Sequence, residues 1–159
     1  MQKQIKIFST LLTVLILAVS CANTNPNDPT KTKEEMLQQK WQYDNFEGGY
    51  DIKADRVDDW AGTAVNYSVA IKEIAWNADN TSGIIYGQYT TAPSYNTGVA
   101  NKYYAIAFKD LTSDTVSISG AYKVDGVSAT DTLAEAKTTF TEANGYFVFG
   151  DGSKCTAVK

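Results

Sequence analysis

Residues 65–71 read VNYSVAI, and along this stretch large apolar side chains alternate with small or polar ones. The odd positions hold Val, Tyr, Val and Ile, and the even positions hold Asn, Ser and Ala. Because successive side chains of a strand point to opposite faces, this alternation predicts a β-strand with one buried face. Further along, the apolar residues Ile74 and Trp76 occupy even-numbered positions instead of odd-numbered ones. We therefore expect a β-bulge near Lys72 and Glu73 that bends the strand.

Further runs with the composition of β-strands follow along the chain. They are rich in Tyr, Val, Ile, Thr and Phe, and Gly, Asn, Asp and Ser separate them. The clearest runs are 84–90, 102–109, 115–123, 146–150 and 155–159. The turn-rich residues 77–83 predict a hairpin that leads into the first of these runs. Asp151 and Gly152 predict a second hairpin, between the last two runs.

One segment near the C-terminus departs from the strand pattern. Thr132 is followed three residues later by Glu135, which is a capping box, and Asn144 with Gly145 supplies a stop signal. Apolar residues between them recur at helical spacing. This predicts a helix over 133–143 that lies against the sheet with Phe140 facing inward.

The strand pattern predicts a mainly β fold with seven or eight short antiparallel strands. Such strands must hide their edges, which a closed barrel achieves by closure and a sandwich achieves with two layers. The sequential hairpin connections favour an antiparallel meander barrel. A two-layer β-sandwich is the alternative.

The start of the domain adds a resemblance to this architecture. Thr32 and Glu35 form another capping box and predict a short helix within 32–40, directly before a first strand that begins at Trp41. A helix followed by a tryptophan at the first strand resembles the lipocalin pattern, although Gln-Lys-Trp at 39–41 replaces the Gly-x-Trp of that family. The resemblance implies a lipocalin-like barrel and assigns no functional residue.

The N-terminus has the organisation of an export signal. Lys3 and Lys6 precede a mostly apolar run at 7–19. Thirteen helical residues rise roughly 20 Å, less than the ~30 Å hydrocarbon core of a bilayer, so a permanent transmembrane helix is not expected. Residues 18–21 (AVSC) resemble the lipobox of bacterial lipoproteins. Ala at the third position before Cys21 is similar to the looser spirochaete-type lipobox.

The lipobox resemblance implies a lipid anchor and defines the domains. Residues 1–20 are then a signal peptide, 21–31 are the acylated Cys21 with a flexible tether, and 32–159 are one β-rich domain. We expect palmitate on Cys21 and a location in the cell envelope, more specifically the outer membrane, because no Asp follows this cysteine. Cys155 would then have no partner in the chain and is interpreted as a small apolar residue.

Composition excludes several classes of function. The chain has no histidine and a single arginine, Arg56, which excludes His-based triads, His-ligated zinc or haem and clustered arginine clamps on phosphates. Without the two signal lysines, 12 basic residues stand against 18 acidic ones. This acidic balance argues against nucleic acid as a partner. We expect no cofactor and no enzymatic activity.

One cluster of carboxylates is a candidate metal site. Asp51, Asp55, Asp58 and Asp59 lie close together in the sequence and could ligate calcium or act as paired carboxylates. Their spacing meets no known calcium loop, so we interpret them as a solvated acidic turn. We expect no metal site.

The aromatic residues indicate a contact surface. Ten tyrosines are present, and tyrosine suits protein interfaces and sugar stacking. Five of them surround the expected loop 91–101 and are the candidate contact patch: Tyr86, Tyr89, Tyr95, Tyr103 and Tyr104. The expected function is a monomeric, lipid-anchored binding module for a protein or glycan. The alternative is a lipocalin-like carrier of a small apolar ligand, and inward-facing Ala105, Ala107 and Gly120 would favour its cavity.

Overall fold

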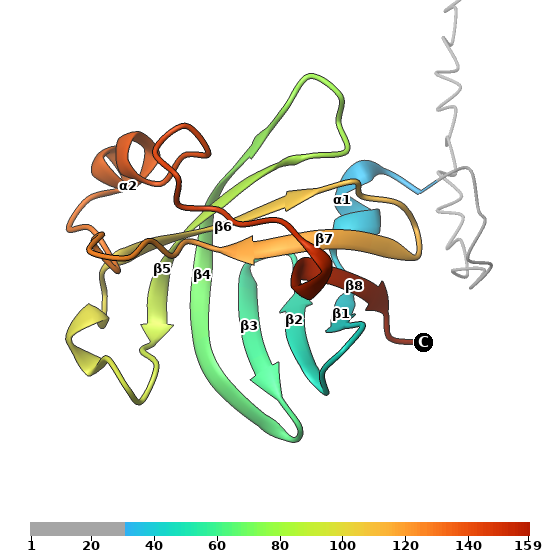
Figure 1. The fold of residues 1–159 in the computed structure, drawn as a ribbon, viewed down its shortest axis with the longest axis horizontal. Coiled ribbons are helices and arrows are strands. Elements are labelled where there is room, and N and C mark those ends of the chain that lie inside the picture. The colour runs from blue at the N-terminus through green and yellow to red at the C-terminus, as the bar shows by residue number, and fades with distance from the viewer. Residues whose placement is uncertain (1–30) are drawn as a thin grey trace, which may run out of the picture.

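The computed structural model describes residues 31–159, which form a closed barrel of eight antiparallel strands (Figure 1). Each strand pairs with the next one along the chain, and the last strand pairs with the first. The strands are β1 (Lys40–Tyr43), β2 (Gly48–Ile52), β3 (Arg56–Ala61), β4 (Ala64–Trp76), β5 (Gly83–Thr91), β6 (Tyr103–Lys109), β7 (Thr115–Gly120) and β8 (Lys154–Ala157). The predicted lipocalin-like meander barrel is confirmed, because closure between β8 and β1 decides against the two-layer sandwich.

Strand β4 has the bulge that its sequence predicts and part of the predicted buried face. Tyr67 and Val69 are buried, and they pair across the interior face with Asp59 and Val57 of β3, whereas Val65 near the start of the strand is exposed. The register with β5 shifts between Ile71 and Glu73, as expected for a β-bulge there. The strand therefore stays paired over 13 residues while it bends around the barrel.

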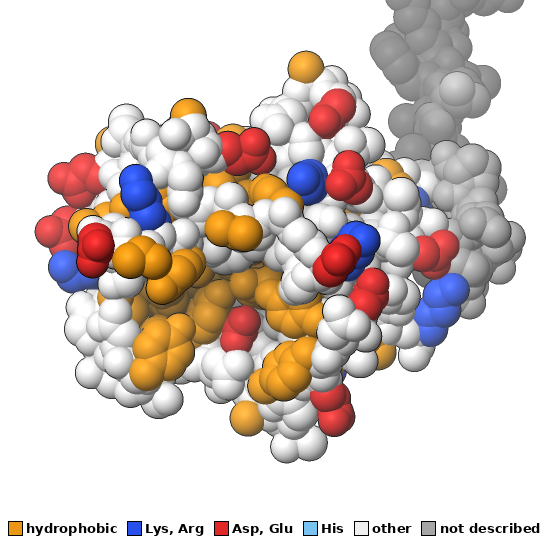
Figure 2. Space-filling model, in the orientation of Figure 1, with side chains coloured by type: hydrophobic (Ala, Val, Ile, Leu, Met, Phe, Trp, Pro, Cys, Tyr) orange, Lys and Arg blue, Asp and Glu red, His pale blue; other side chains and the backbone are white. Residues whose placement is uncertain are grey.

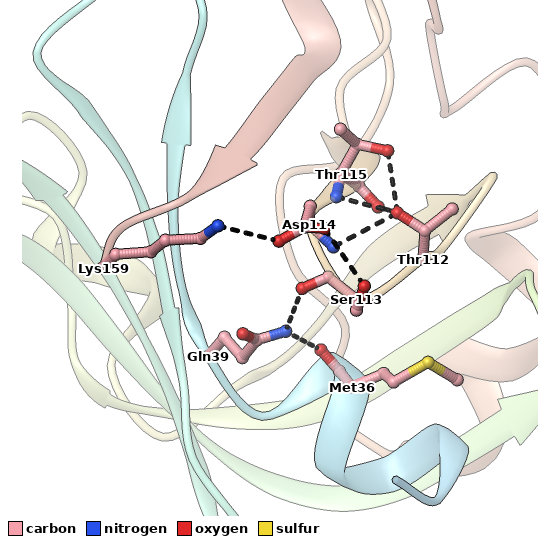
Figure 3. A network of polar contacts seen from close by, with 7 residues as sticks. All are labelled: Met36, Gln39, Thr112, Ser113, Asp114, Thr115 and Lys159. Carbon is pink, nitrogen blue, oxygen red and sulfur yellow. Dashed lines mark hydrogen bonds and ion pairs between the residues drawn. The ribbon is translucent and has the colours of Figure 1, made fainter. Parts of the chain in front are cut away.

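A short helix, α1 (Lys33–Leu37), covers one end of the barrel. The predicted capping box at its start is present. Gln39 Nε2 donates to Met36 O at 2.6 Å and to Ser113 O at 3.2 Å, so the turn between β6 and β7 is tied to the end of the helix (Figure 3). In the same turn, Asp114 forms an ion pair with Lys159 at 3.3 Å. These contacts join the end of α1, the β6–β7 turn and the C-terminal residue at this end of the barrel.

The second helix, α2 (Leu133–Thr139), lies outside the barrel on β5 and β6 (Figure 1). Its capping box is present, but the helix ends at Thr139 rather than at 143. The C-cap residue Phe140 is fully buried, as predicted. The side chain of Asn144 explains the early end, because it donates hydrogen bonds to the carbonyls of Thr138 and Thr139 and so caps the last turn.

The predicted final hairpin is wrong. Residues 146–150 form no strand, and β8 pairs with β7 and β1 instead. Both edges of β8 are occupied because it closes the barrel. The apolar run before it packs on the barrel in part: Tyr146 and Phe147 are buried, whereas Val148 in the middle of the run is exposed. Two 3-10 turns, η1 (Thr97–Val99) and η2 (Asp151–Ser153), complete the described chain.

Among residues 31–159, no helix has the length and apolar character needed to cross a membrane.

Candidate functional site

A pocket of about 460 Å³ opens at the barrel end opposite α1, where β1–β2, β3–β4 and β5–β6 are connected. Its lining residues are Tyr50, Asp59, Asn66, Tyr67, Ser94, Tyr95, Tyr104 and Gly120. Figure 2 shows a hollow lined by hydrophobic side chains, tyrosines included, with an acidic side chain inside it. Asp59 is the only charged residue in the lining of the pocket.

Strand register brings the aromatic and acidic groups together. Asp59 of β3 pairs with Tyr50 of β2 on one side and with Tyr67 of β4 on the other. Directly paired residues have side chains on the same face of a sheet, so all three point into the mouth. Tyr104 of β6 completes the wall, with its ring centroid 5.8 Å from that of Tyr67 and the two planes at 83°. The ring centroid of Tyr89 lies 5.1 Å from that of Tyr104.

Gly120 provides space for the tyrosine hydroxyls. A Cβ atom at this position would lie 2.5 Å from the hydroxyl oxygen of Tyr104 and 3.0 Å from that of Tyr50. Of the three small residues expected to favour a cavity, Gly120 lines the pocket. Ala105 and Ala107 have the opposite parity to Tyr104 on β6 and are buried on the outer face of the wall.

The Asp59 carboxylate lies in an unfavourable environment for its charge. Burial raises its pKa, and the hydrogen bond from Asn66 Nδ2, at 2.7 Å, opposes that rise. Every ion pair formed within residues 31–159 involves other carboxylates. Asp59 therefore has an amide partner but no cation among the described residues.

The neighbouring carboxylate, Asp58, has the opposite environment. It faces away from the pocket and accepts hydrogen bonds from Lys53 and Arg56, both at 3.0 Å, and from Ser68 at 2.7 Å. Burial acts to raise the pKa of Asp58, but the Ser68 hydrogen bond and the two cations outweigh it, so the pKa is lowered. The interpretation of Asp58 and Asp59 as a solvated turn is therefore wrong, because both lie on β3 and face opposite sides of the barrel wall.

Replacing Asp59 by asparagine is expected to increase stability at neutral pH. Because the folded-state pKa of Asp59 is raised, the folded protein loses stability as pH rises from 3.8 through that pKa, and the penalty is complete above it. The substituted amide keeps the shape of the side chain and an oxygen that can accept from Asn66. Urea melts should show a gain over the wild type at pH 7 that disappears as the pH falls below 3.8.

The adjacent variant Asp58→Asn is the matched comparison and has the opposite sign. The lowered pKa of Asp58 stabilises the fold above pH 3.8, and this contribution is lost as pH falls through the folded-state value. We expect Asp58→Asn to cost on the order of 1 kcal/mol at pH 7, since its cationic partners are partly exposed. Equal changes for the two variants would contradict the assignment of opposite faces.

The tyrosines of the pocket act as neutral groups. Burial raises the pKa of Tyr50, Tyr67 and Tyr104 well above the usual value of 10.0. The hydroxyl of Tyr67 donates to that of Tyr50 at 3.4 Å. These side chains therefore contribute neutral hydroxyl groups to the pocket, and they do not ionise at physiological pH.

The structure divides the five tyrosines of the predicted contact patch. Tyr89, Tyr95 and Tyr104 lie at or beside the pocket, with Tyr95 at its rim and 84% exposed. Tyr86 is buried on the outer wall, where its hydroxyl donates to Phe140 O at 3.3 Å. Tyr103 pairs with Thr130. The prediction omitted four pocket residues that come from earlier strands: Tyr50, Asp59, Asn66 and Tyr67.

The remaining sequence candidates lie elsewhere. Cys155 is buried in β8, and burial raises the pKa of its thiol to about 12, in keeping with an apolar role. Cys21, the signal peptide and the tether up to residue 30 lie outside the described residues. Within residues 31–159, no three acidic or cysteine side chains are grouped closely enough to hold a metal ion.

Comparison of the chain with protein-family models, with curated proteins and with solved structures finds no match.

Proposed function

We propose that this protein is an exported lipoprotein, anchored through Cys21 at the cell envelope, whose barrel binds a small ligand non-enzymatically at its mouth. The observation that carries the proposal is the pocket of about 460 Å³, in which residues of β2, β3, β4, β6 and β7 surround a half-buried carboxylate. Pockets of a few hundred Å³ with a few converging polar groups are typical of small-molecule sites.

The pocket favours binding over catalysis. Tyr50, Tyr67 and Tyr104 stay protonated at physiological pH because burial raises their pKa values. Asp59 is the one carboxylate in the lining, so the pocket contains no second acid with which to share a proton. A neutral aromatic wall with one fixed charge is suited to orienting a ligand.

The interior beneath the pocket supports a ligand at the mouth rather than an apolar ligand deep in the barrel. Large side chains fill that interior, and each is less than 2% exposed: Trp41, Ile52, Val57, Val69, Ile85, Ile106, Phe108 and Ile118. The accessible space is instead lined by hydroxyl, amide and carboxylate groups. A protein or glycan partner at the exposed rim, near Tyr95, is the other candidate.

The anchor is tested by labelling with palmitate in a double-membrane bacterial host. Wild-type protein should incorporate the label and sediment with membranes, whereas Cys21→Ser should lose the label completely and appear in the soluble fraction. Cys155→Ser is the matched control and should keep both properties, because this thiol is buried in the barrel. Full labelling of the Cys21→Ser protein would refute the lipid anchor.

Binding at the mouth is tested by nuclear magnetic resonance on the Cys21→Ser protein, which keeps the whole barrel. A panel of small amines, carboxylates, sugars and fatty acids should contain members that shift the signals of Tyr67, Tyr104 and Gly120. Signals of Leu37, buried in α1 at the closed end, should stay fixed. A panel that leaves all three pocket residues unmoved would count against the proposed site.

A further inference from the structure

The charge of the pocket restricts the chemistry of its ligand. Lysine and arginine are absent from the lining, and Asp59 contributes the only formal charge. The cations nearest to it in sequence, Lys53 and Arg56, are engaged by Asp58 on the other face of β3. The field inside the mouth is therefore of one sign, and an anionic ligand would be repelled.

One aromatic ring of the pocket is open to a ligand. Tyr50, Tyr67 and Tyr104 are at most 9% exposed, and the edge-to-face contact of Tyr67 with Tyr104 occupies a ring face, so these three side chains form the floor of the mouth. Tyr95 lines the same pocket at its rim and is 84% exposed. The face of an aromatic ring carries the negative part of its quadrupole and attracts cations, so Asp59 and the ring of Tyr95 favour the same kind of ligand.

Other ligand classes satisfy this site less well. A neutral sugar could stack on tyrosine, but it would leave the Asp59 charge half-buried without a counter-charge, which is costly. Calcium takes six to eight oxygen ligands, and the lining supplies one carboxylate. The volume of about 460 Å³ is also suited to an organic molecule rather than a bare ion.

We propose that the mouth of the barrel binds an organic cation with an ammonium group, which pairs with Asp59 and lies between the floor formed by Tyr50, Tyr67 and Tyr104 and the ring of Tyr95 at the rim. This proposal rests on the proposed binding function and specifies its ligand class. Alkylammonium and quaternary ammonium groups share the required chemistry: one positive charge and methyl or methylene groups that pack on an aromatic ring. Tyr95 lies at the rim, where it contacts the incoming ligand.

The decisive experiment compares charged and neutral ligands of the same shape. Isothermal titration on the Cys21→Ser protein at pH 7 uses choline, n-butylammonium, the uncharged choline isostere 3,3-dimethyl-1-butanol, and glucose. At least one ammonium compound should bind, and 3,3-dimethyl-1-butanol should bind at least tenfold more weakly than choline. Equal affinity of choline and its neutral isostere would overturn the proposal.

Matched variants locate the contact. Asp59→Asn should weaken ammonium binding at least tenfold, although it is expected to make the fold more stable. Asp55→Asn removes the same charge from an exposed turn at the opposite barrel end and should leave the affinity unchanged. Tyr95→Ala, at an exposed rim position, should weaken binding severalfold without loss of stability. Ammonium binding that survives Asp59→Asn would contradict the role of this carboxylate.

The pH dependence provides an independent measurement. The groups near Asp59 are Asn66 and buried tyrosines of β1, β2, β4, β5 and β6, whose pKa values are all raised. Among these groups, Asp59 alone titrates in the acidic range. Affinity for choline should fall as pH is lowered through the raised pKa of Asp59, and it should be independent of pH in Asp59→Asn. A flat profile in the wild type would overturn the proposal.

Sedimentation with vesicles distinguishes two sources of the ammonium group. Binding to phosphatidylcholine vesicles but not to phosphatidylglycerol vesicles would assign it to a lipid headgroup, and binding of free choline alone would assign it to a soluble compound.

The magnetic resonance panel separates this proposal from the proposed binding function. If glucose or another neutral compound shifts the signals of the pocket residues while both ammonium probes fail, the ligand class is wrong and the binding function stands. If no compound shifts them, the binding function itself fails.

Discussion

Trp41→Ala is expected to lower the free energy of unfolding by about 3–5 kcal/mol, the usual cost of truncating a buried tryptophan. The side chain is fully buried, and its strand neighbours are Tyr50 on β2 and Ala157 on β8. Trp41 thus packs where the first strand meets the last and the barrel closes. Its indole Nε1–H donates to Leu37 O at 2.9 Å, which holds α1 over this end. Urea melts followed by far-ultraviolet circular dichroism measure the change.

Two further variants separate the contributions of packing and hydrogen bonding. Trp41→Phe keeps most of the apolar area but removes the indole donor. Because the Leu37 carbonyl still accepts from the Gln39 N–H at 2.9 Å, this variant should cost about 0.5–1.5 kcal/mol. Tyr95→Ala removes an aromatic ring that is 84% exposed and should cost less than about 0.5 kcal/mol. A mild Trp41→Ala variant, similar to Tyr95→Ala, would be incompatible with a barrel closed at this position.

The fold could be predicted because its local signals agree with one another. The alternation in β4 reflects one face packed inside the barrel, and the change of parity near Lys72 and Glu73 corresponds to a real bulge. Thr32 and Thr132 cap helices because a hydroxyl and a glutamate three residues on satisfy the free N–H groups. Sequential strands then needed only short connections, which led to the meander.

Local sequence signals could not identify the last strand of the barrel. Residues 146–150 have the composition of a strand, yet they pack on the outside of the wall near Ser119, whose hydroxyl accepts from the Val148 N–H at 3.0 Å. The place beside β7 is taken by the residues of β8. Which of two apolar runs closes a barrel is decided by competition for one pair of edges. No single segment contains that information.

The inward position of Asp59 could have been predicted from the sequence of β3. Val57 and Asp59 have the same parity, so burial of the valine implies that the aspartate also faces the interior. Trp60, the next residue, gives the opposite indication, because a large aromatic side chain is usually the inward one. It faces outward here, after a register shift between Asp59 and Trp60, and Lys40 Nζ lies 3.9 Å from its ring centroid. The sequence of one strand does not show that residues from another strand cover part of its outer face.

The tyrosine patch was predicted from nearness in sequence, whereas barrel geometry groups residues by parity and register. Tyr103 and Tyr104 are neighbours in the chain and therefore face opposite sides of β6. Tyr50 and Tyr67 lie 17 residues apart and meet through their hydroxyls. Assembling the pocket thus required the pairing of β2, β3 and β4, and that pairing depends on closure of the whole sheet.

Phe140→Ala is expected to cost about 3–5 kcal/mol, since it removes a fully buried aromatic ring. The ring stands edge-on to that of Tyr146 at a centroid distance of 5.0 Å, and its centroid lies 6.2 Å from that of the Tyr104 ring. Its backbone carbonyl accepts the hydroxyl of Tyr86 from the outer wall of the barrel. Phe140 therefore fastens α2 and the long connection before β8 to strands β5 and β6. Urea melts followed by circular dichroism test this anchor.

Thr139→Ala is the matched control, because the neighbouring side chain is half-buried and its hydroxyl has no hydrogen-bond partner within residues 31–159. It should change stability by less than about 0.5 kcal/mol. Since Phe140 also borders Tyr104, its loss should shift the magnetic resonance signals of the pocket, and Thr139→Ala should leave them in place. If both variants were equally mild and left the pocket unchanged, α2 would be an independent appendage, and the shape of the mouth would depend on the barrel strands alone.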